Sequence, residues 1–241
     1  ISSDNTQITL DSTSKEVTYG DSITLKASVT SDTPQTVTWK SSNTAVATVK
    51  DGVVTATGKG TAKITASLPN GRSAVCTVKV TTKKLPTSGY SYASTAQYTG
   101  SAIIPTVTVK DGSKVLRQNI DYRVMVTNNV KIGHANIAIS GMGNYYGSYS
   151  AGFDIIPAKQ TIQKLETRYK GFFVDWAQKG SATGYEIQYS TSANMSGATS
   201  KHLTANKPDN LTISGLTADK TYYVRVRSYT NVGSKTYYGP W

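Results

Sequence analysis

Residues 37–66 read VTWKSSNTAVATVKDGVVTATGKGTAKITA, and this stretch decides the fold of the first part of the chain. Val37 and Trp39 alternate with polar residues, which is typical of a strand with one buried face. Asp51-Gly52 lies between two runs of β-branched residues, and this is the strongest short sequence signal for a β-hairpin. The run Ala62-Lys-Ile-Thr-Ala66 then alternates again. The stretch therefore predicts short strands joined by tight turns.

The same residues resemble a known domain family. The pattern W-x-S-S-N-x-x-V-A-T-V-x-x-G-x-V-T-A-x-x-x-G-T-A-x-I-T-A is similar to the bacterial immunoglobulin-like domain of group 2, found in intimin-like adhesins and many Gram-positive surface proteins. Alternating apolar residues over 20–29 predict one further half-buried strand. We expect residues 1–81 to form a small two-sheet sandwich with Trp39 as its central core residue.

Residues 87–157 follow a charged linker that ends in Pro86, and they are rich in tyrosine. The pattern Y-T-G-x-x-I-x-P-x-V-x-V-x-D-G, followed by D-Y-x-V, N-N, I-G-x-A and G-x-G-N-Y-x-G, resembles a repeat module of surface proteins from clostridia and their relatives. In such proteins this module often lies beside group 2 immunoglobulin-like domains. The resemblance implies another small β-sandwich or a β-grasp-like unit.

Residues 159–241 resemble a fibronectin type III domain. Phe172, Val174 and Trp176 alternate on one strand, and Trp176 matches the core tryptophan of that family. Tyr222, six residues after Leu216, fits the tyrosine corner, whose hydroxyl reaches back to the backbone. Alternation along this strand places the row Tyr223, Arg225 and Arg227 on the outer face. The three segments together predict an all-β chain of three tandem immunoglobulin-like sandwich modules in an extended arrangement.

Composition agrees with this class and narrows the range of functions. The 241 residues are 37% hydrophobic and carry a net charge of +12, half of it scattered over the last third. Such a surface is ordinarily solvated, although it would also attract anionic partners. No pattern for sequence-specific nucleic-acid binding and no apolar run long enough for a transmembrane segment is present. The single cysteine, Cys76, is expected to be a buried small hydrophobe.

Catalysis needs ionisable groups that converge, and the sequence offers few of them. The two histidines, His134 and His202, lie in different expected modules, and the 14 acidic residues are dispersed. Neither histidine belongs to a motif such as H-E-x-x-H or G-x-S-x-G. We therefore expect no enzyme activity, no cofactor and no metal site in this chain.

Aromatic side chains in the middle segment are the candidate ligand contacts. Flat rings with polar tips suit stacking on sugars or packing on another protein. The alternative is that these side chains fill the core or brace turns. The candidates are Tyr90, Tyr92, Tyr145, Tyr146 and Tyr149.

The resemblances imply a non-catalytic fragment of a Gram-positive surface or secreted multidomain protein. It would act outside the cell as a stalk or spacer and in adhesion, with glycans, cell-wall polymers or host surface proteins as partners. The alternative is a carbohydrate-binding or spacer segment accessory to an extracellular polysaccharide-degrading enzyme. A third hypothesis is a pilin-like shaft stabilised by Lys–Asn isopeptide bonds.

Overall fold

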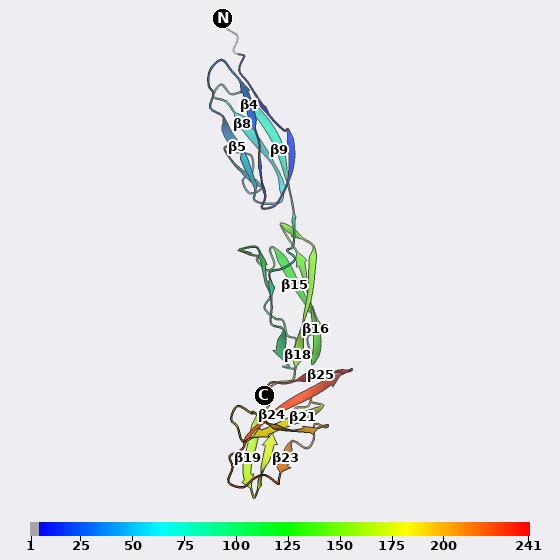
Figure 1. The fold of residues 1–241 in the computed structure, drawn as a ribbon. Helices are drawn as coiled ribbons and strands as arrows, with labels where there is room; N and C mark the ends of the chain where they lie inside the picture. The colour runs from blue at the N-terminus through cyan, green and yellow to red at the C-terminus, as the bar shows by residue number, and fades with distance from the viewer. Residues whose placement is uncertain (1–4) are drawn as a thin grey trace. The chain divides into compact units, whose positions relative to one another are not determined.

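The computed structural model describes residues 5–241, and every helix or strand assigned in that range is a β-strand (Figure 1). The first four residues of the expected 1–81 domain lie outside this described part. Contacts between residues divide the chain into two compact units. The first extends to residue 90 and includes 109–124 and 139–149; the second contains 91–108, 125–138 and 150–241. The predicted all-β class with three immunoglobulin-like modules is confirmed, whereas the extended arrangement stays a prediction.

The first module has two main sheets and one smaller strand pair. The sheets have the strand orders β2-β9-β8-β5 and β3-β7-β6, and β1 pairs with β4. Figure 1 shows β8 and β9 side by side. The strands are β1 (Gln7–Leu10), β2 (Ser14–Thr18), β3 (Ser22–Thr24), β4 (Ala27–Thr30), β5 (Thr38–Ser41), β6 (Ala47–Lys50), β7 (Val53–Ala56), β8 (Gly60–Ser67) and β9 (Ser73–Thr81).

The Asp51-Gly52 turn joins β6 to β7 as the sequence predicts. Both turn residues have positive φ, 49° at Asp51 and 81° at Gly52, as a two-residue hairpin turn of type I′ requires. A β-carbon at Gly52 would lie 2.5 Å from the carbonyl oxygen of Leu25 and 3.2 Å from the ring of Trp39. Trp39 is only half-buried, but it packs against the core, which contains fully buried Cys76.

The prediction of one continuous strand over 20–29 is wrong. The structure divides this segment into β3, which pairs with β7, and β4, which pairs with β1. Between them Leu25 is buried and its amide donates to the carbonyl of Gly52, while the amide of Lys26 donates to the side chain of Asp11. The alternation persists because both halves bury their apolar side chains, Ile23 and Leu25 in one core cluster and Ala27 and Val29 in another, but the hydrogen bonds pass to another sheet.

The middle module contains a four-stranded sheet of order β12-β18-β16-β15, a three-stranded sheet of order β11-β13-β14, and the parallel pair β10-β17. Ala135, Ile137 and Ile139 alternate as buried residues along β16. The strands are β10 (Lys83–Lys84), β11 (Tyr90–Ser91), β12 (Thr95–Gln97), β13 (Thr108–Asp111), β14 (Lys114–Val115), β15 (Tyr122–Thr127), β16 (Gly133–Gly141), β17 (Tyr145–Tyr146) and β18 (Ser148–Ile156).

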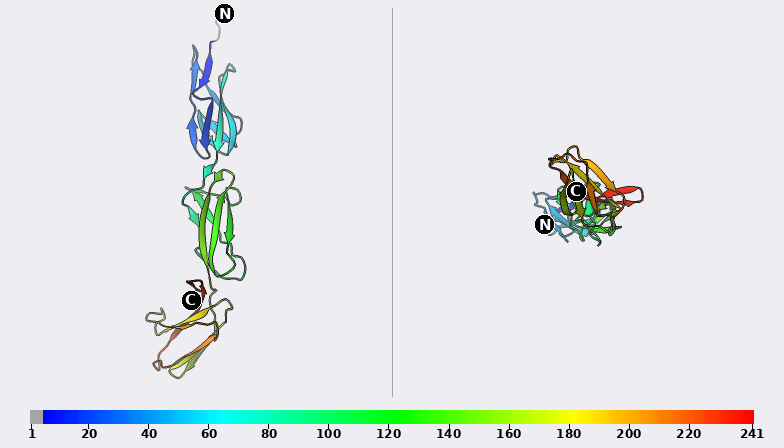
Figure 2. Two further views of the ribbon diagram at one scale, coloured as in Figure 1. Left: turned by 90° about the vertical axis from the view of Figure 1, so that its right-hand side faces the viewer. Right: turned by 90° about the horizontal axis from the view of Figure 1, so that it is seen from below.

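The third module pairs the sheet β19-β20-β23 with the sheet β22-β21-β24-β25 (Figure 2). Trp176 is fully buried and packs on Tyr185 with ring centroids 5.2 Å apart. The hydroxyl of Tyr222 accepts a hydrogen bond from the amide of Thr217, which confirms the expected hydroxyl-to-backbone contact. The strands are β19 (Ile162–Arg168), β20 (Gly171–Trp176), β21 (Gly184–Ser190), β22 (Thr199–Leu203), β23 (Asn210–Ile213), β24 (Tyr223–Val232) and β25 (Lys235–Tyr238).

Candidate functional site

Tyr145, one of the five candidate tyrosines, is placed in the interior. Its side chain is only 3% exposed, and its ring meets that of Tyr19 edge-on with the centroids 5.6 Å apart. Its hydroxyl donates to the carboxylate of Asp111 at 3.1 Å. Burial, and then the neighbouring Asp111 carboxylate, raise the pKa of Tyr145. The hydroxyl therefore stays protonated as a hydrogen-bond donor, and almost none of the ring is exposed to solvent.

Asp111 joins Tyr145 to a small group of charged residues in the first unit. Lys83 Nζ lies 2.6 Å from the Asp111 carboxylate. Burial by itself would raise the pKa of Asp111, but the hydrogen bonds from Lys83 and Tyr145 hold that pKa below its usual value. Lys114 donates to the Tyr19 hydroxyl, with its ammonium 4.7 Å from the centroid of that ring. A cavity of about 370 Å³ lies beside these side chains.

The other four candidate tyrosines are more accessible but do not converge on one pocket. Tyr90 and Tyr149 stack face to face, with centroids 3.7 Å apart and an interplanar angle of 4°. Each ring therefore covers one face of the other. Burial, and then Tyr149, raise the pKa of Tyr90, whose hydroxyl donates to the carbonyl of Pro86. Tyr92 is half-buried, and Tyr146 is 51% exposed.

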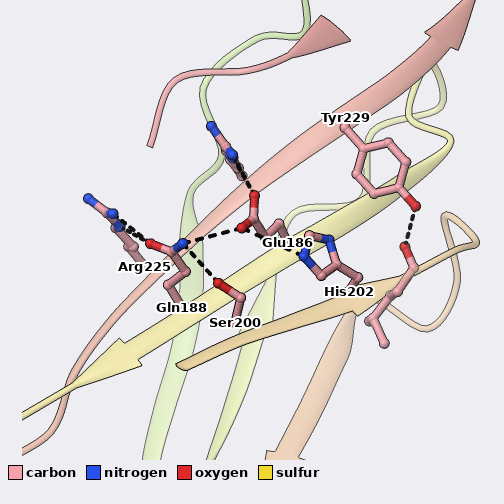
Figure 3. Close-up of polar contacts among 8 residues, drawn as sticks. Glu186, Gln188, Ser200, His202, Arg225 and Tyr229 are labelled. Atoms are coloured by element: carbon pink, nitrogen blue, oxygen red, sulfur yellow. Dashed lines mark hydrogen bonds and ion pairs between the residues drawn. The ribbon is translucent and has the colours of Figure 1, made fainter. Parts of the chain in front are cut away.

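The third module carries a polar ladder on the sheet β22-β21-β24-β25, drawn in Figure 3. The register places Glu186 opposite Arg227 and Gln188 opposite Arg225. Glu186 is buried and accepts from Arg227 at 2.6–2.7 Å, while Gln188 accepts from Arg225 and donates to Glu186.

Aromatic rings from the end of the chain cover the two arginines of this ladder. The Arg227 guanidinium lies 4.1 Å from the ring centroid of Tyr238 and 4.2 Å from that of Trp241. The Arg225 guanidinium lies 4.3 Å from the centroid of Trp241. Sequence alternation correctly placed Arg225 and Arg227 on this face, but it did not identify Glu186 and Trp241 as their partners.

A groove in the second unit was not foreseen from the sequence. Three cavities of about 500, 310 and 440 Å³ follow one another along it. Lys131 and Ile132 line both the first and the second, while Tyr98 and Ser181 line both the second and the third. These residues come from the β15–β16 loop, the β20–β21 loop and the segment after β12. Tyr98 and Ile132 belong to the pattern quoted for residues 87–157, but Ser181 lies in another module, and that pattern carries no signal that would group the three.

Other classes of site find little support in the described chain. Among residues 5–241, no three or more histidine, cysteine, aspartate or glutamate side chains gather to hold a metal ion. His134 and His202 are both exposed at the surface, where His134 Nδ1 lies 2.9 Å from the Asp154 carboxylate. The same described range contains no helix with the length and apolar character needed to cross a membrane.

Comparison with known proteins identifies two segments of the chain. Residues 4–78 match the family model of the bacterial Ig-like domain (group 2), and residues 160–240 match that of the fibronectin type III domain. A lacto-N-biosidase from Bifidobacterium bifidum is 57% identical over 51 residues, which are 21% of this chain and 5% of that protein. This chain thus spans only a small part of that relative's length.

Two solved structures cover nearly the whole chain at low identity. The first to third FN domains of chicken CNTN1 cover 97% of this chain and 94% of their own, with 10% identity and a TM-score of 0.32. Three consecutive Ig domains of titin, in a variant form, cover 96% of each chain with 13% identity and a TM-score of 0.24. From the family models, residues 4–78 are a bacterial Ig-like domain of group 2 and residues 160–240 are a fibronectin type III domain.

Proposed function

We propose that this chain is a non-catalytic accessory segment of an extracellular bacterial glycosidase. Its modules would hold a catalytic domain at a distance from neighbouring domains and close to a glycan surface. The observation that carries this proposal is the 57% identity, over 51 residues, to a protein named lacto-N-biosidase. Because the match covers 5% of that protein, it supports a shared accessory segment and assigns no reaction to this chain.

The placement of the aromatic side chains supports a spacing role for two of the modules. Trp176 and Tyr185 pack into the core of the third module, and Tyr145 is buried in the middle one. Rings held in this way stabilise their own sandwich and are unavailable to a substrate. A sandwich whose rings are packed in its core can hold neighbouring domains apart without binding the glycan itself.

The surface stalk with an adhesive role is the second candidate. The bacterial Ig-like match over residues 4–78 favours it, since the sequence pattern there resembles that of surface adhesins. Both candidates share the spacing role and differ in what the chain is attached to. The isopeptide-stabilised shaft stays a prediction, and an intact mass lower by about one ammonia per bond would support it.

The test deletes these residues from the full-length parent protein. If the proposal is right, the parent hydrolyses a glycoside, and the deletion lowers kcat/KM on an immobilised glycan while leaving a small soluble glycoside unaffected. A parent without hydrolytic activity, whose deletion weakens attachment of cells to a surface, would refute the glycosidase role and favour the stalk.

Side-chain variants of the intact chain examine the exposed tyrosine. Tyr146→Ala should leave the fold unchanged and reduce retention on a polysaccharide gel if Tyr146 contacts sugar. Tyr145→Phe serves as the control, because its buried ring is kept and only the hydrogen bond to Asp111 is lost. Equal retention of the wild type and both variants would remove Tyr146 from the candidate contacts.

A further inference from the structure

The groove of the second unit combines apolar walls with polar side chains around one aromatic ring. Tyr98 is half-buried and lines two of its three cavities, so one aromatic ring lies near the middle. Asn128 lines the first cavity and Gln178 the third, and both are exposed. Hydroxyls of Ser181 and Thr230 also line it. A ring flanked by amide and hydroxyl groups can stack on a sugar face while the polar groups bind its hydroxyls.

The charge in this groove has one sign. Lys131 and Lys179 line it, and neither ammonium forms an ion pair with another described residue. No aspartate or glutamate of the described chain lines any of the three cavities. A cleft with charges of one sign raises the local concentration of oppositely charged ligands.

His134, which lines the first cavity, is paired with an acidic side chain, Asp154, whose charge is already balanced. Asp154 binds His134 through one carboxylate oxygen and Lys235 through the other, at 2.9 and 2.8 Å. The hydrogen bonds from Lys235, and then from His134, hold the pKa of Asp154 below its usual value. Asp154 therefore remains ionised with its charge balanced by Lys235, and it leaves the two groove lysines uncompensated.

We infer that this groove binds an acidic oligosaccharide, with a sugar ring on Tyr98 and carboxylates of the ligand near Lys131 and Lys179. The inference rests on the proposed function, because it names the glycan class that this accessory segment would hold. An acidic peptide is a poorer match, since amides and hydroxyls outnumber apolar side chains along the walls. A nucleic acid is a poorer match as well, because two lysines can neutralise few phosphates.

The test is isothermal titration of the intact chain with a galacturonate trisaccharide and with sialyllactose. The neutral counterpart of the galacturonate trisaccharide is its methyl ester, and the neutral counterpart of sialyllactose is lactose. We expect at least one acidic sugar to bind, and its neutral counterpart to bind roughly fivefold or more weakly. The acidic sugar should also lose affinity as salt is raised.

Variants then locate the site. Tyr98→Ala should weaken binding roughly tenfold, whereas Tyr98→Phe, which keeps the ring, should stay within about twofold. Lys131→Gln and Lys179→Gln should each weaken it roughly two- to fivefold. Lys201→Gln, on the exposed strand β22 away from the groove, is the matched control and should change nothing. The tryptophan fluorescence of each variant, to which buried Trp176 contributes, verifies that it is folded.

Four results would overturn the inference. In the first, neither acidic sugar binds. In the second, an acidic sugar and its neutral counterpart bind equally well. In the third, a poly-glutamate peptide or a single-stranded oligonucleotide binds as well as the acidic sugar. In the fourth, binding is lost in Lys201→Gln but not in the groove variants. The deletion experiment on the parent protein is independent of these titrations. A deletion effect without acidic-sugar binding would thus refute the groove and leave the accessory role standing.

Discussion

Replacing Arg227 by methionine would break the buried ion pair of the third module. The Glu186 side chain is 6% exposed, and two nitrogens of Arg227 lie 2.6–2.7 Å from its Oε2 atom. Methionine keeps an unbranched apolar stem but is shorter than arginine and removes the charge. The carboxylate then retains only the amide of Gln188, at 3.2 Å, and the ring of His202, at 3.8 Å.

The expected cost follows from what remains at the carboxylate. Removing one partner of a buried ion pair costs about 3–5 kcal/mol. Arg227 also stacks between Tyr238 and Trp241, and exposed cation–π contacts contribute about 0.5–1 kcal/mol each. Because Glu186 keeps Gln188 and methionine can still pack on the rings, we expect a loss of about 3 kcal/mol. For a domain of this size that is a fall in melting temperature of roughly 12–24 °C.

Urea unfolding followed by tryptophan fluorescence measures this loss. In a Trp39→Phe background, the remaining tryptophans all lie in the third module, so the signal reports that module alone. The matched control is Lys164→Met, which breaks the Lys164–Glu166 pair of the same module, whose side chains are 56% and 37% exposed. Exposed pairs contribute about 0–1 kcal/mol. If Arg227→Met costs no more than about 1 kcal/mol, the Glu186–Arg227 pair does not stabilise the module as a buried ion pair does.

Three further predictions concern the first two modules. Gly52→Ala should destabilise the first module by about 2 kcal/mol, measured by thermal unfolding, because φ is 81° and the added β-carbon meets a carbonyl oxygen at 2.5 Å. Asp111 has a lowered folded-state pKa, so its contribution is present above its unfolded pKa of about 3.9 and is lost as the pH falls through the folded value. The urea midpoint of the middle module, followed by near-ultraviolet circular dichroism of tyrosine, should therefore fall below about pH 4, and Asp111→Asn should flatten that dependence. Cys76 is fully buried and its pKa is raised by burial, so it should resist a thiol reagent in the folded protein and react in urea.

Local patterns were the part of the fold that the sequence could predict. The hairpin at Asp51-Gly52 depends on two adjacent residues, and the buried position of Trp176 depends on alternation along one strand. The tyrosine corner depends on the short spacing between Leu216 and Tyr222. Each of these signals lies within a few residues, so no knowledge of the partner strand was needed.

Features that depend on the partner strand could not be predicted. Apolar residues do alternate over 20–29, but the backbone hydrogen bonds change to another sheet at Leu25. The polarity of the side chains does not indicate which strand the backbone pairs with. The Glu186–Arg227 contact joins positions 41 residues apart, and it requires the register of β21 on β24. Trp241 follows the last strand, because β25 ends at Tyr238, and its contact with the arginines depends on how the segment after β25 folds back over β24.

The same distinction explains why net charge predicts so little about binding. The sequence carries +12, but a cation contributes to an external field only where no neighbouring carboxylate balances it. Arg227 is balanced by buried Glu186, whereas Lys131 and Lys179, which line a groove, form no ion pair with any residue of 5–241. Screening acts strongly on exposed charges and weakly on buried pairs. Raising the salt concentration should therefore weaken acidic-sugar binding while leaving the unfolding free energy of the third module nearly constant. If salt lowered both the acidic-sugar affinity and the unfolding free energy of the third module, then Arg227 would be as exposed to solvent as the two groove lysines.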